Sequence, residues 1–70
     1  MLILSQNKKL LVAIENSSGV YTYENKLKID LPEGIEELGK YSNEERTIEV
    51  LKIIYNRYDR GQRVFEMPEE

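Results

Sequence analysis

The chain has 70 residues, with 13 acidic and 10 basic side chains and a formal net charge of −3, and it contains neither cysteine nor histidine. These counts exclude a disulfide, remove the usual ligands of a structural zinc site and remove the usual partners of a catalytic nucleophile. The acidic balance is spread along the chain and argues against general nucleic-acid binding, which needs a concentrated basic surface. We therefore expect no enzymatic activity and no cofactor.

A chain of this length makes a single domain, 1–70, near the lower size limit for independent folding. Natural domains this small usually gain stability from a disulfide, a metal or a partner subunit. With the first two disfavoured, we expect a homodimer or larger assembly. The apolar run Leu2–Leu4 is too short for a signal peptide, and no stretch is long enough to cross a membrane, so we expect a cytoplasmic protein.

The first 40 residues form a series of short apolar segments separated by turn-forming residues. The residues between these segments, such as 15–19, favour local hydrogen bonds or positive φ angles. The segment Lys26–Leu31 alternates polar and apolar side chains, as a strand with one buried face does. We predict strands at 2–5, 10–15, 20–23, 26–31 and 35–38.

The first two predicted strands lack this alternation. Residues 2–4 and 10–14 are apolar throughout, which is typical of strands buried on both faces. A single amphipathic helix can cover only one face of a small sheet. We therefore expect the other face to meet a second copy of the chain.

An amphipathic helix is predicted in the C-terminal half. Ser42 and Glu45 have the spacing of a capping box, and Gly61 can adopt the left-handed conformation that ends a helix. Ile53 lies off the apolar stripe and hints at a partner surface, and residues 64–67 are predicted as a last strand. The stripe comprises Thr47, Ile48, Val50, Leu51, Ile54, Tyr55 and Tyr58.

These elements predict an α+β fold, with a small antiparallel sheet of four to six strands and one helix packed across a face. The sequence leaves open which face of the strands meets the helix. The predicted core comprises Leu4, Leu10, Val12, Ile14, Leu27, Ile29, Leu51, Ile54 and Tyr58.

Residues 34–42 nearly fit the phosphate-binding pattern G-x-x-x-x-G-K-[ST] and lead into the predicted helix. However, Tyr41 takes the position whose small hydroxyl should hold magnesium, and Glu36 and Glu37 would repel phosphate oxygens. We reject the motif and interpret the glutamates as a solvated surface.

Three arginines and two tyrosines cluster near the end of the predicted helix. Guanidinium groups and tyrosine rings suit a phosphate-bearing or nucleotide ligand, and Lys40, beside the helix N-terminus, is a second candidate contact for an anion. The simpler interpretation is that cations favour the negative end of a helix. The candidate ligand-binding residues are Lys40, Tyr55, Arg57, Tyr58, Arg60 and Arg63.

Tyr21 and Tyr23 share one face of their predicted strand. They can anchor a protein interface or serve as core or cross-strand aromatics, and stacking on a nucleic-acid base is the least favoured use. The candidate oligomer interface comprises Ile3, Leu11, Ala13, Tyr21, Tyr23 and Ile53.

Several motifs carry a resemblance: Leu38-Gly39-Lys40-Tyr41, Glu44-Glu45-Arg46, Val50-Leu51 and the ending Val64-Phe65-Glu66-Met67-Pro68-Glu69. With them the chain resembles small proteins of Firmicutes phages and prophages over most of its length. The motifs are structural rather than chemical, so the resemblance carries over no catalytic residue. It implies a short phage protein that acts by occupying a host target, such as a defence component or its nucleotide messenger.

We therefore predict a non-catalytic binding protein, encoded by a phage or prophage, that works as a homo-oligomer and sequesters a host ligand such as an anionic nucleotide messenger of a defence system. Two alternatives stay open: a protein–protein inhibitor or adaptor that binds a host protein, and a purely structural phage protein. The predicted partners are further copies of the chain, with an anionic small molecule or a host protein, and neither nucleic acid in general nor a membrane.

Overall fold

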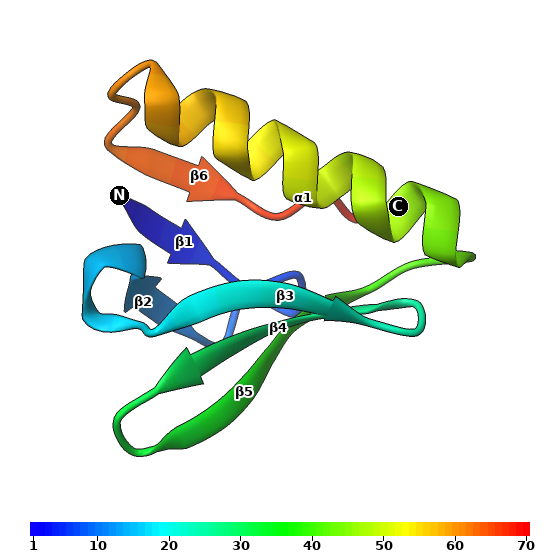
Figure 1. Cartoon of the computed structure of the whole chain (residues 1–70), viewed down its shortest axis with the longest axis horizontal. Helices are drawn as coiled ribbons and strands as arrows, with labels where there is room; N and C mark the ends of the chain where they lie inside the picture. The colour runs from blue at the N-terminus through cyan, green and yellow to red at the C-terminus, as the bar shows by residue number, and fades with distance from the viewer.

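The computed structural model describes all 70 residues and shows six strands, one α-helix and one turn of 3₁₀-helix, which confirms the predicted α+β class. The helix α1 lies above the strands in Figure 1. None of the helical segments has the length and apolar character needed to span a bilayer. The elements are β1 (Leu2–Leu4), β2 (Leu11–Ala13), η1 (Ile14–Asn16), β3 (Gly19–Tyr23), β4 (Lys26–Leu31), β5 (Gly34–Lys40), α1 (Glu44–Asp59) and β6 (Val64–Glu66).

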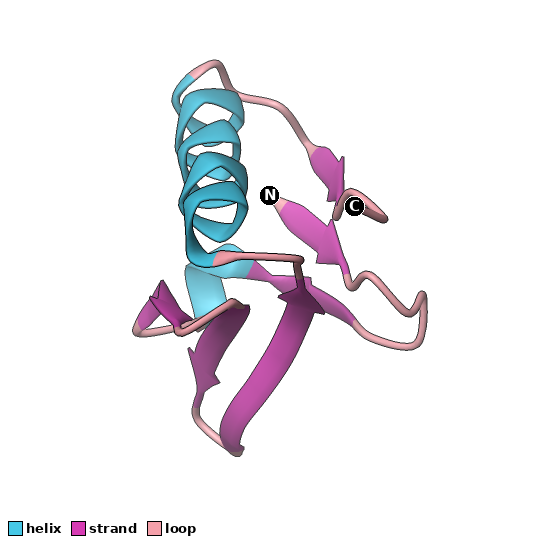
Figure 2. Ribbon diagram, turned by 90° about the vertical axis from the view of Figure 1, so that its right-hand side faces the viewer, coloured by secondary structure: helices cyan, strands magenta, loops and turns pink.

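The strands form two three-stranded sheets, and the prediction of one antiparallel sheet is wrong. The first sheet has the order β2-β1-β6, and the second is an antiparallel meander, β3-β4-β5. Within the first sheet β1 pairs antiparallel with β2 but parallel with β6, because the chain returns from α1 in the same direction as β1. Figure 2 shows the helix and the two sheets on three sides of a shared interior.

The second sheet follows its sequence pattern closely. Strand β4 has the predicted bounds, and Leu27 and Ile29 are completely buried on the face toward the helix. The two-residue turn before β4 places Glu24 at a φ of 55°, so that Tyr23 lies opposite Lys26 in the hairpin register. The predicted second strand, by contrast, is cut short because residues 14–16 form the 3₁₀ turn η1.

A β-bulge interrupts the pairing of β4 with β5. Leu27 lies opposite Gly39 and Lys28 opposite Glu37, so Leu38 is an extra residue on β5. Leu38 is buried, with 1% of its surface exposed. Since residues directly opposite one another share a face, Leu38 and Gly39 both lie on the core side and Lys40 returns to the outer face.

Helix α1 begins one residue later than predicted. The Asn43 side chain accepts a hydrogen bond from the Arg46 amide at 2.8 Å, so Asn43, and not Ser42, caps the helix. At the other end Gly61 has a φ of 76°, as predicted, and its amide donates to the carbonyl of Tyr58.

The buried stripe of α1 is rotated relative to the prediction. Thr47, Val50 and Ile54 are buried, whereas Tyr55 and Tyr58 are 69% and 47% exposed. Tyr55 lies on a flank of this stripe, whereas Tyr58 shares the face of Ile54 but lies in the last turn of the helix. The assignment of Tyr58 to the core is therefore wrong.

The core is supplied by both sheets, the helix and the C-terminal segment. Of the predicted core residues, Leu27, Ile29 and Ile54 are fully buried and Val12, Ile14 and Leu51 pack against the core, while Leu4 and Leu10 are only half-buried. The buried apolar residues are Ile3, Leu27, Ile29, Leu38, Tyr41, Val50, Ile54, Phe65 and Met67.

Tyr41 occupies the space beneath Gly39. An added Cβ on Gly39 would lie 2.9 Å from the Tyr41 hydroxyl oxygen, so only glycine leaves room for this ring. The hydroxyl donates to the Pro68 carbonyl at 2.8 Å, and the Tyr41 carbonyl accepts from the Asn25 side chain at 2.8 Å. Tyr41 thereby joins the second sheet to the C-terminal segment.

Gln6 makes a second connection between the same parts. Its side-chain oxygen accepts from the Lys40 amide at 2.8 Å, and its side-chain nitrogen donates to the carbonyls of Lys40 and Glu69 at 3.0 and 2.9 Å. The loop after β1, the end of β5 and the C-terminal segment are thus held together by one amide group.

We expect Gly39→Ala to destabilise the fold by about 1–3 kcal/mol, because the new methyl group overpacks against the buried Tyr41 ring. Chemical denaturation measures the change. Gly19→Ala is the matched control, since Gly19 is also in a strand of the second sheet and no atom lies within 4 Å of its added Cβ. Equal stability of the two variants would contradict this account of Gly39.

The stability of the fold should also fall at high pH because of Tyr41. Burial raises the pKa of Tyr41 from 10.0 to about 12, so the native state retains the phenolic proton that the unfolded chain loses first. This contribution is complete below pH 10 and is lost as the pH rises toward 12. Denaturation midpoints of the wild type and of Tyr41→Phe between pH 8 and 11.5 test it. The wild type should lose more stability over this range, and parallel curves would contradict the prediction.

Candidate functional site

The arginines predicted to bind an anion do not converge. Arg57 donates to the side chain of Gln62 at 3.2 Å, and Arg60 is exposed at the end of α1. Only Arg63 lines a groove, of about 400 Å³, which it shares with Tyr58 and Glu15. The structure therefore supports the simpler interpretation for Arg57, which lies in the last turn of the helix, where cations are favourable.

The two predicted tyrosines of α1 do lie together. Tyr55 and Tyr58 line a groove of about 210 Å³ between the helix, η1 and β3, and every residue around it is apolar or aromatic. Tyr58 also borders the groove that contains Glu15, whose pKa is lowered by a hydrogen bond from the amino group of Met1. The Met1 amino group pairs with Glu15, so Arg63 is the one cation of this groove without an ion-pair partner, and it lies close to the negative end of the helix.

Lys40 is at the opposite end of α1 from these residues. The helix has 16 residues and is therefore about 24 Å long. Lys40 ends β5 just before the helix begins, while Arg63 follows the last turn. One chain cannot hold a small ligand with both.

Two residues of the predicted interface pack in or against the core of the chain. Ile3 is 0% exposed and belongs to the core, since β1 turns this side chain toward the helix. Ile53 is half-buried and packs against the core on the flank of α1 opposite Tyr55. The burial of Ile3 contradicts its assignment to an interface, whereas Ile53 keeps part of its surface exposed.

Leu11 and Ala13 remain on the outside, as predicted. They share the outer face of the first sheet with Leu2, Leu4 and Val64, and Leu11 and Val64 are 57% and 52% exposed. We call these five side chains the apolar outer face. Its only charged pair, Lys8 with Glu66, lies at one end.

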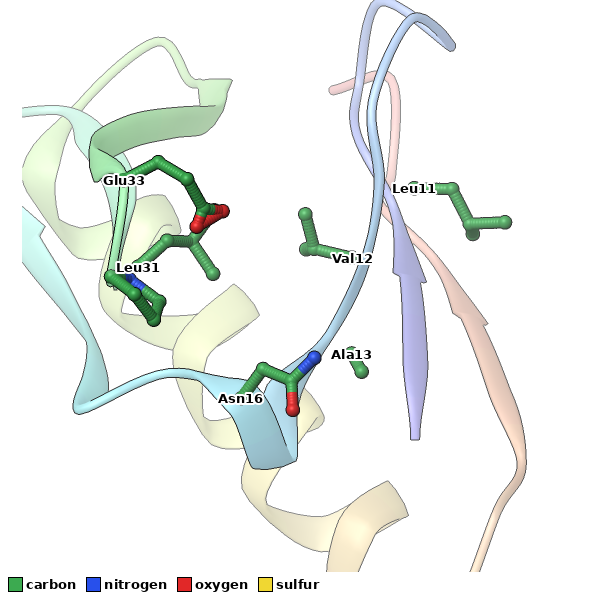
Figure 3. A pocket seen from close by; sticks show the side chains of 7 residues that line it. Leu11, Val12, Ala13, Asn16, Leu31 and Glu33 are labelled. Atoms are coloured by element: carbon green, nitrogen blue, oxygen red, sulfur yellow. The ribbon is translucent and has the colours of Figure 1, made fainter.

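A groove of about 300 Å³ runs along the edge of β2. Figure 3 shows Val12 directed across it toward Leu31 and Glu33, while Leu11 points away to the other side of the strand. The carboxylate of Glu33 is its one charged group and no cation faces it. The groove therefore offers no convergent set of polar groups for a specific ligand.

The outer face of the second sheet brings together lysines and tyrosines. Tyr23 of β3, Lys26 of β4 and Lys40 of β5 are directly opposite one another, and the adjacent row contains Tyr21 and Lys28. Tyr21 and Tyr23 are 37% and 56% exposed. We call these five residues the Tyr–Lys face.

The lysines of this face have no carboxylate partner within 4.0 Å, since the three ion pairs of the chain lie elsewhere. Glu37 is opposite Lys28 in the register, but the Lys28 ammonium lies over the Tyr23 ring instead, 5.4 Å from its centroid. Glu37 is therefore part of the Lys28 row, and Glu24 lies in the turn next to the other row without forming an ion pair. The row that contains Lys26 and Lys40 is purely basic.

The sequence does contain a signal for the Tyr–Lys face, although its residues are not clustered along the chain. A two-residue turn fixes the hairpin register, which sets Tyr23 opposite Lys26 and Tyr21 opposite Lys28. The position of Lys40 opposite Lys26 could not be predicted from the hairpin register, because it depends on the β-bulge at Leu38. Residues 34–40 form a strand paired with β4, which agrees with the rejection of a phosphate-binding loop.

Comparisons with models of protein families, with curated proteins and with solved structures find no match to this chain. The function is therefore inferred from the geometry alone. The Tyr–Lys face combines two exposed tyrosines with three lysines that form no ion pair, and it is the strongest candidate for a binding site.

Proposed function

We propose that the chain is a non-catalytic binding protein that holds an anionic ligand on the Tyr–Lys face. The observation that carries this proposal is the direct opposition of Lys26 and Lys40 on neighbouring strands, with no carboxylate between them. Stoichiometric binding, rather than conversion of the ligand, suits a chain without histidine or cysteine.

The repulsion between Lys26 and Lys40 supports the presence of a ligand between them. Like charges directly opposite in a sheet are destabilising, on the scale of about 0.2–1 kcal/mol for a cross-strand pair. Local rules of this kind are usually broken at functional sites. An anion with two charged oxygens placed between Lys26 and Lys40 would replace repulsion with two charge-assisted hydrogen bonds.

The β-bulge supports the same assignment. If residues 37–40 were all paired in regular alternation, with no bulge at Leu38, Lys40 would turn toward the core. Bulges often re-aim a side chain next to a binding site. Here the bulge places an ammonium group beside Lys26 on the outer face.

Charge reversal at Lys26 separates a binding role from a structural one. We expect Lys26→Glu to abolish pyrophosphate binding, measured by calorimetry at low ionic strength without divalent cations. The same substitution should leave the free energy of unfolding unchanged or raise it by up to about 1 kcal/mol, because the introduced carboxylate would face the opposite charge of Lys40.

Lys52→Glu is the control, since Lys52 is exposed on the outer side of α1 and carries the same change in net charge. It should bind pyrophosphate nearly as well as the wild type. Loss of stability in Lys26→Glu, or equal binding by the two variants, would count against the proposal.

A second proposal, that the chain forms a homo-oligomer, rests on the apolar outer face of the first sheet. Its five side chains present leucine, alanine and valine to solvent on strands β1, β2 and β6, with no helix over them. Identical apolar faces can stack about a twofold axis and bury each other. We propose that a second copy of the chain covers this face.

The size of the face sets the expected strength of this contact. Three strands of three residues make a surface of only about 14 by 10 Å, well below the 800 Å² or so per partner of a standard interface. The whole chain exposes 4761 Å², close to the roughly 4,600 Å² expected of a monomer of its mass. We therefore propose a dimer that dissociates on dilution, rather than an obligate one.

We expect Leu11→Lys to make the chain monomeric at concentrations where the wild type is dimeric, because a charge would be buried within the contact. Light scattering coupled to size-exclusion chromatography between 10 µM and 1 mM measures this, a range that brackets weak self-association. Ile48→Lys is the control, an exposed apolar residue on α1 away from this face. A wild type that stays monomeric throughout would refute self-association and favour a host protein as the partner of this face.

A further inference from the structure

We infer that the ligand of the Tyr–Lys face is a phosphate-bearing aromatic base, with its ring on Tyr23 and its phosphate between Lys26 and Lys40. This inference rests on the proposed function and adds the chemical class of the ligand. The shared chemistry is that of a free nucleotide or of one nucleotide unit in a single strand.

The position of Tyr23 is the evidence that the ligand contains an aromatic base. More than half of this side chain is exposed, at the edge of the second sheet and in the same row as the two opposed lysines. An exposed tyrosine offers a flat surface on which any base can stack. No buried structural role accounts for it, because the core face of β3 is provided by Val20 and Thr22, opposite Ile29 and Leu27.

The spacing of the row fits one nucleotide unit. Neighbouring strands are about 4.8 Å apart, so Tyr23 and Lys40 are about 10 Å apart across the sheet, with Lys26 between them. A base on the outer strand and a phosphate over the other two strands can therefore be held at once. A simple inorganic anion would use only the lysine part of the row.

The second row limits the ligand to a single unit. Tyr21 is less exposed than Tyr23, and Glu37, opposite Lys28, would repel a second phosphate. The Lys28 ammonium lies over the Tyr23 ring, so a base stacked on that side of the ring would replace this cation–π contact and leave Lys28 free to attract the anion. The geometry thus favours one base and its attached phosphates over a longer strand lying along the sheet.

The test compares ligands that contain one or both components. Adenosine diphosphate, inorganic pyrophosphate and adenosine are titrated into the wild-type chain by calorimetry at low ionic strength without divalent cations. We expect adenosine diphosphate to bind about tenfold more tightly than pyrophosphate, as stacking of one base on an aromatic side chain provides. Adenosine alone should bind far more weakly than either.

Two variants test whether Tyr23 is the residue that contacts the base. Tyr23→Leu should remove the advantage of adenosine diphosphate over pyrophosphate while leaving pyrophosphate binding unchanged. Tyr55→Leu is the matched control, because Tyr55 is a more exposed tyrosine on α1 and should leave the advantage intact. Circular dichroism verifies that both variants are folded, which is expected because both side chains are largely exposed.

These measurements test the role of the Tyr23 ring separately from the proposed anion site. Equal affinity for adenosine diphosphate and pyrophosphate, or an advantage that survives Tyr23→Leu, would overturn the role of the ring and leave the anion site standing. Absence of binding by both ligands would overturn both. Competition by a thymidine hexanucleotide then distinguishes the two sources: equal affinity per molecule for the hexanucleotide and thymidine monophosphate supports a free nucleotide, and tighter binding of the hexanucleotide supports a unit of a single strand.

Discussion

The fold depends on the burial of one phenol group between the second sheet and the C-terminal segment. Each sheet has three strands and buries one apolar face against the other sheet and the helix, so the contacts that hold these parts together matter for the whole fold. Tyr41 makes such contacts with its ring under Gly39 and its hydroxyl on Pro68, and Gln6 adds an amide bridge beside it. No buried side-chain nitrogen or oxygen in the structure lacks a hydrogen-bond partner. The junction is therefore polar and buried without the cost of an unpaired group. These contacts also explain why the motif around Gly39 and the ending with Pro68 are structural, since each is shaped to fit the other.

The bulge in β5 links this junction to the candidate site. Leu38 and Gly39 both face the interior, and because the bulge accommodates this extra residue, Lys40 faces outward on the other side of the sheet. The packing of the core and the position of Lys40 in the proposed binding site thus both depend on this one β-bulge. A chain that lost the bulge would have to bury a lysine or expose a leucine at this point, so the charged face can hardly change without the core changing too.

The sequence predicted those features whose causes are local. The alternation in β4 and the glycine after α1 each act within a few residues, and both were confirmed. The pairing of β1 with β6 could not be predicted, because a strand of three residues carries no pattern that selects its partner. The rotation of α1 was misjudged because Tyr55 and Tyr58 count as apolar on a helical wheel, although they extend beyond the interior. For the site, proximity along the chain pointed to the arginines after α1, whereas the opposition of Lys26 and Lys40 arises from register across three strands.

The parallel pairing of β1 with β6 has a consequence for how the molecule forms. The second sheet is a meander whose strands are neighbours in sequence, so it can assemble from local contacts alone. The first sheet must join Ile3 to Phe65 across nearly the full length of the chain, which makes closure of that loop a slow and late event. During synthesis on the ribosome β1 therefore remains without its parallel partner, with hydrophobic side chains unprotected, until residues 64–66 have emerged. Nascent chains halted before that point would be the species most prone to aggregate or to recruit a chaperone.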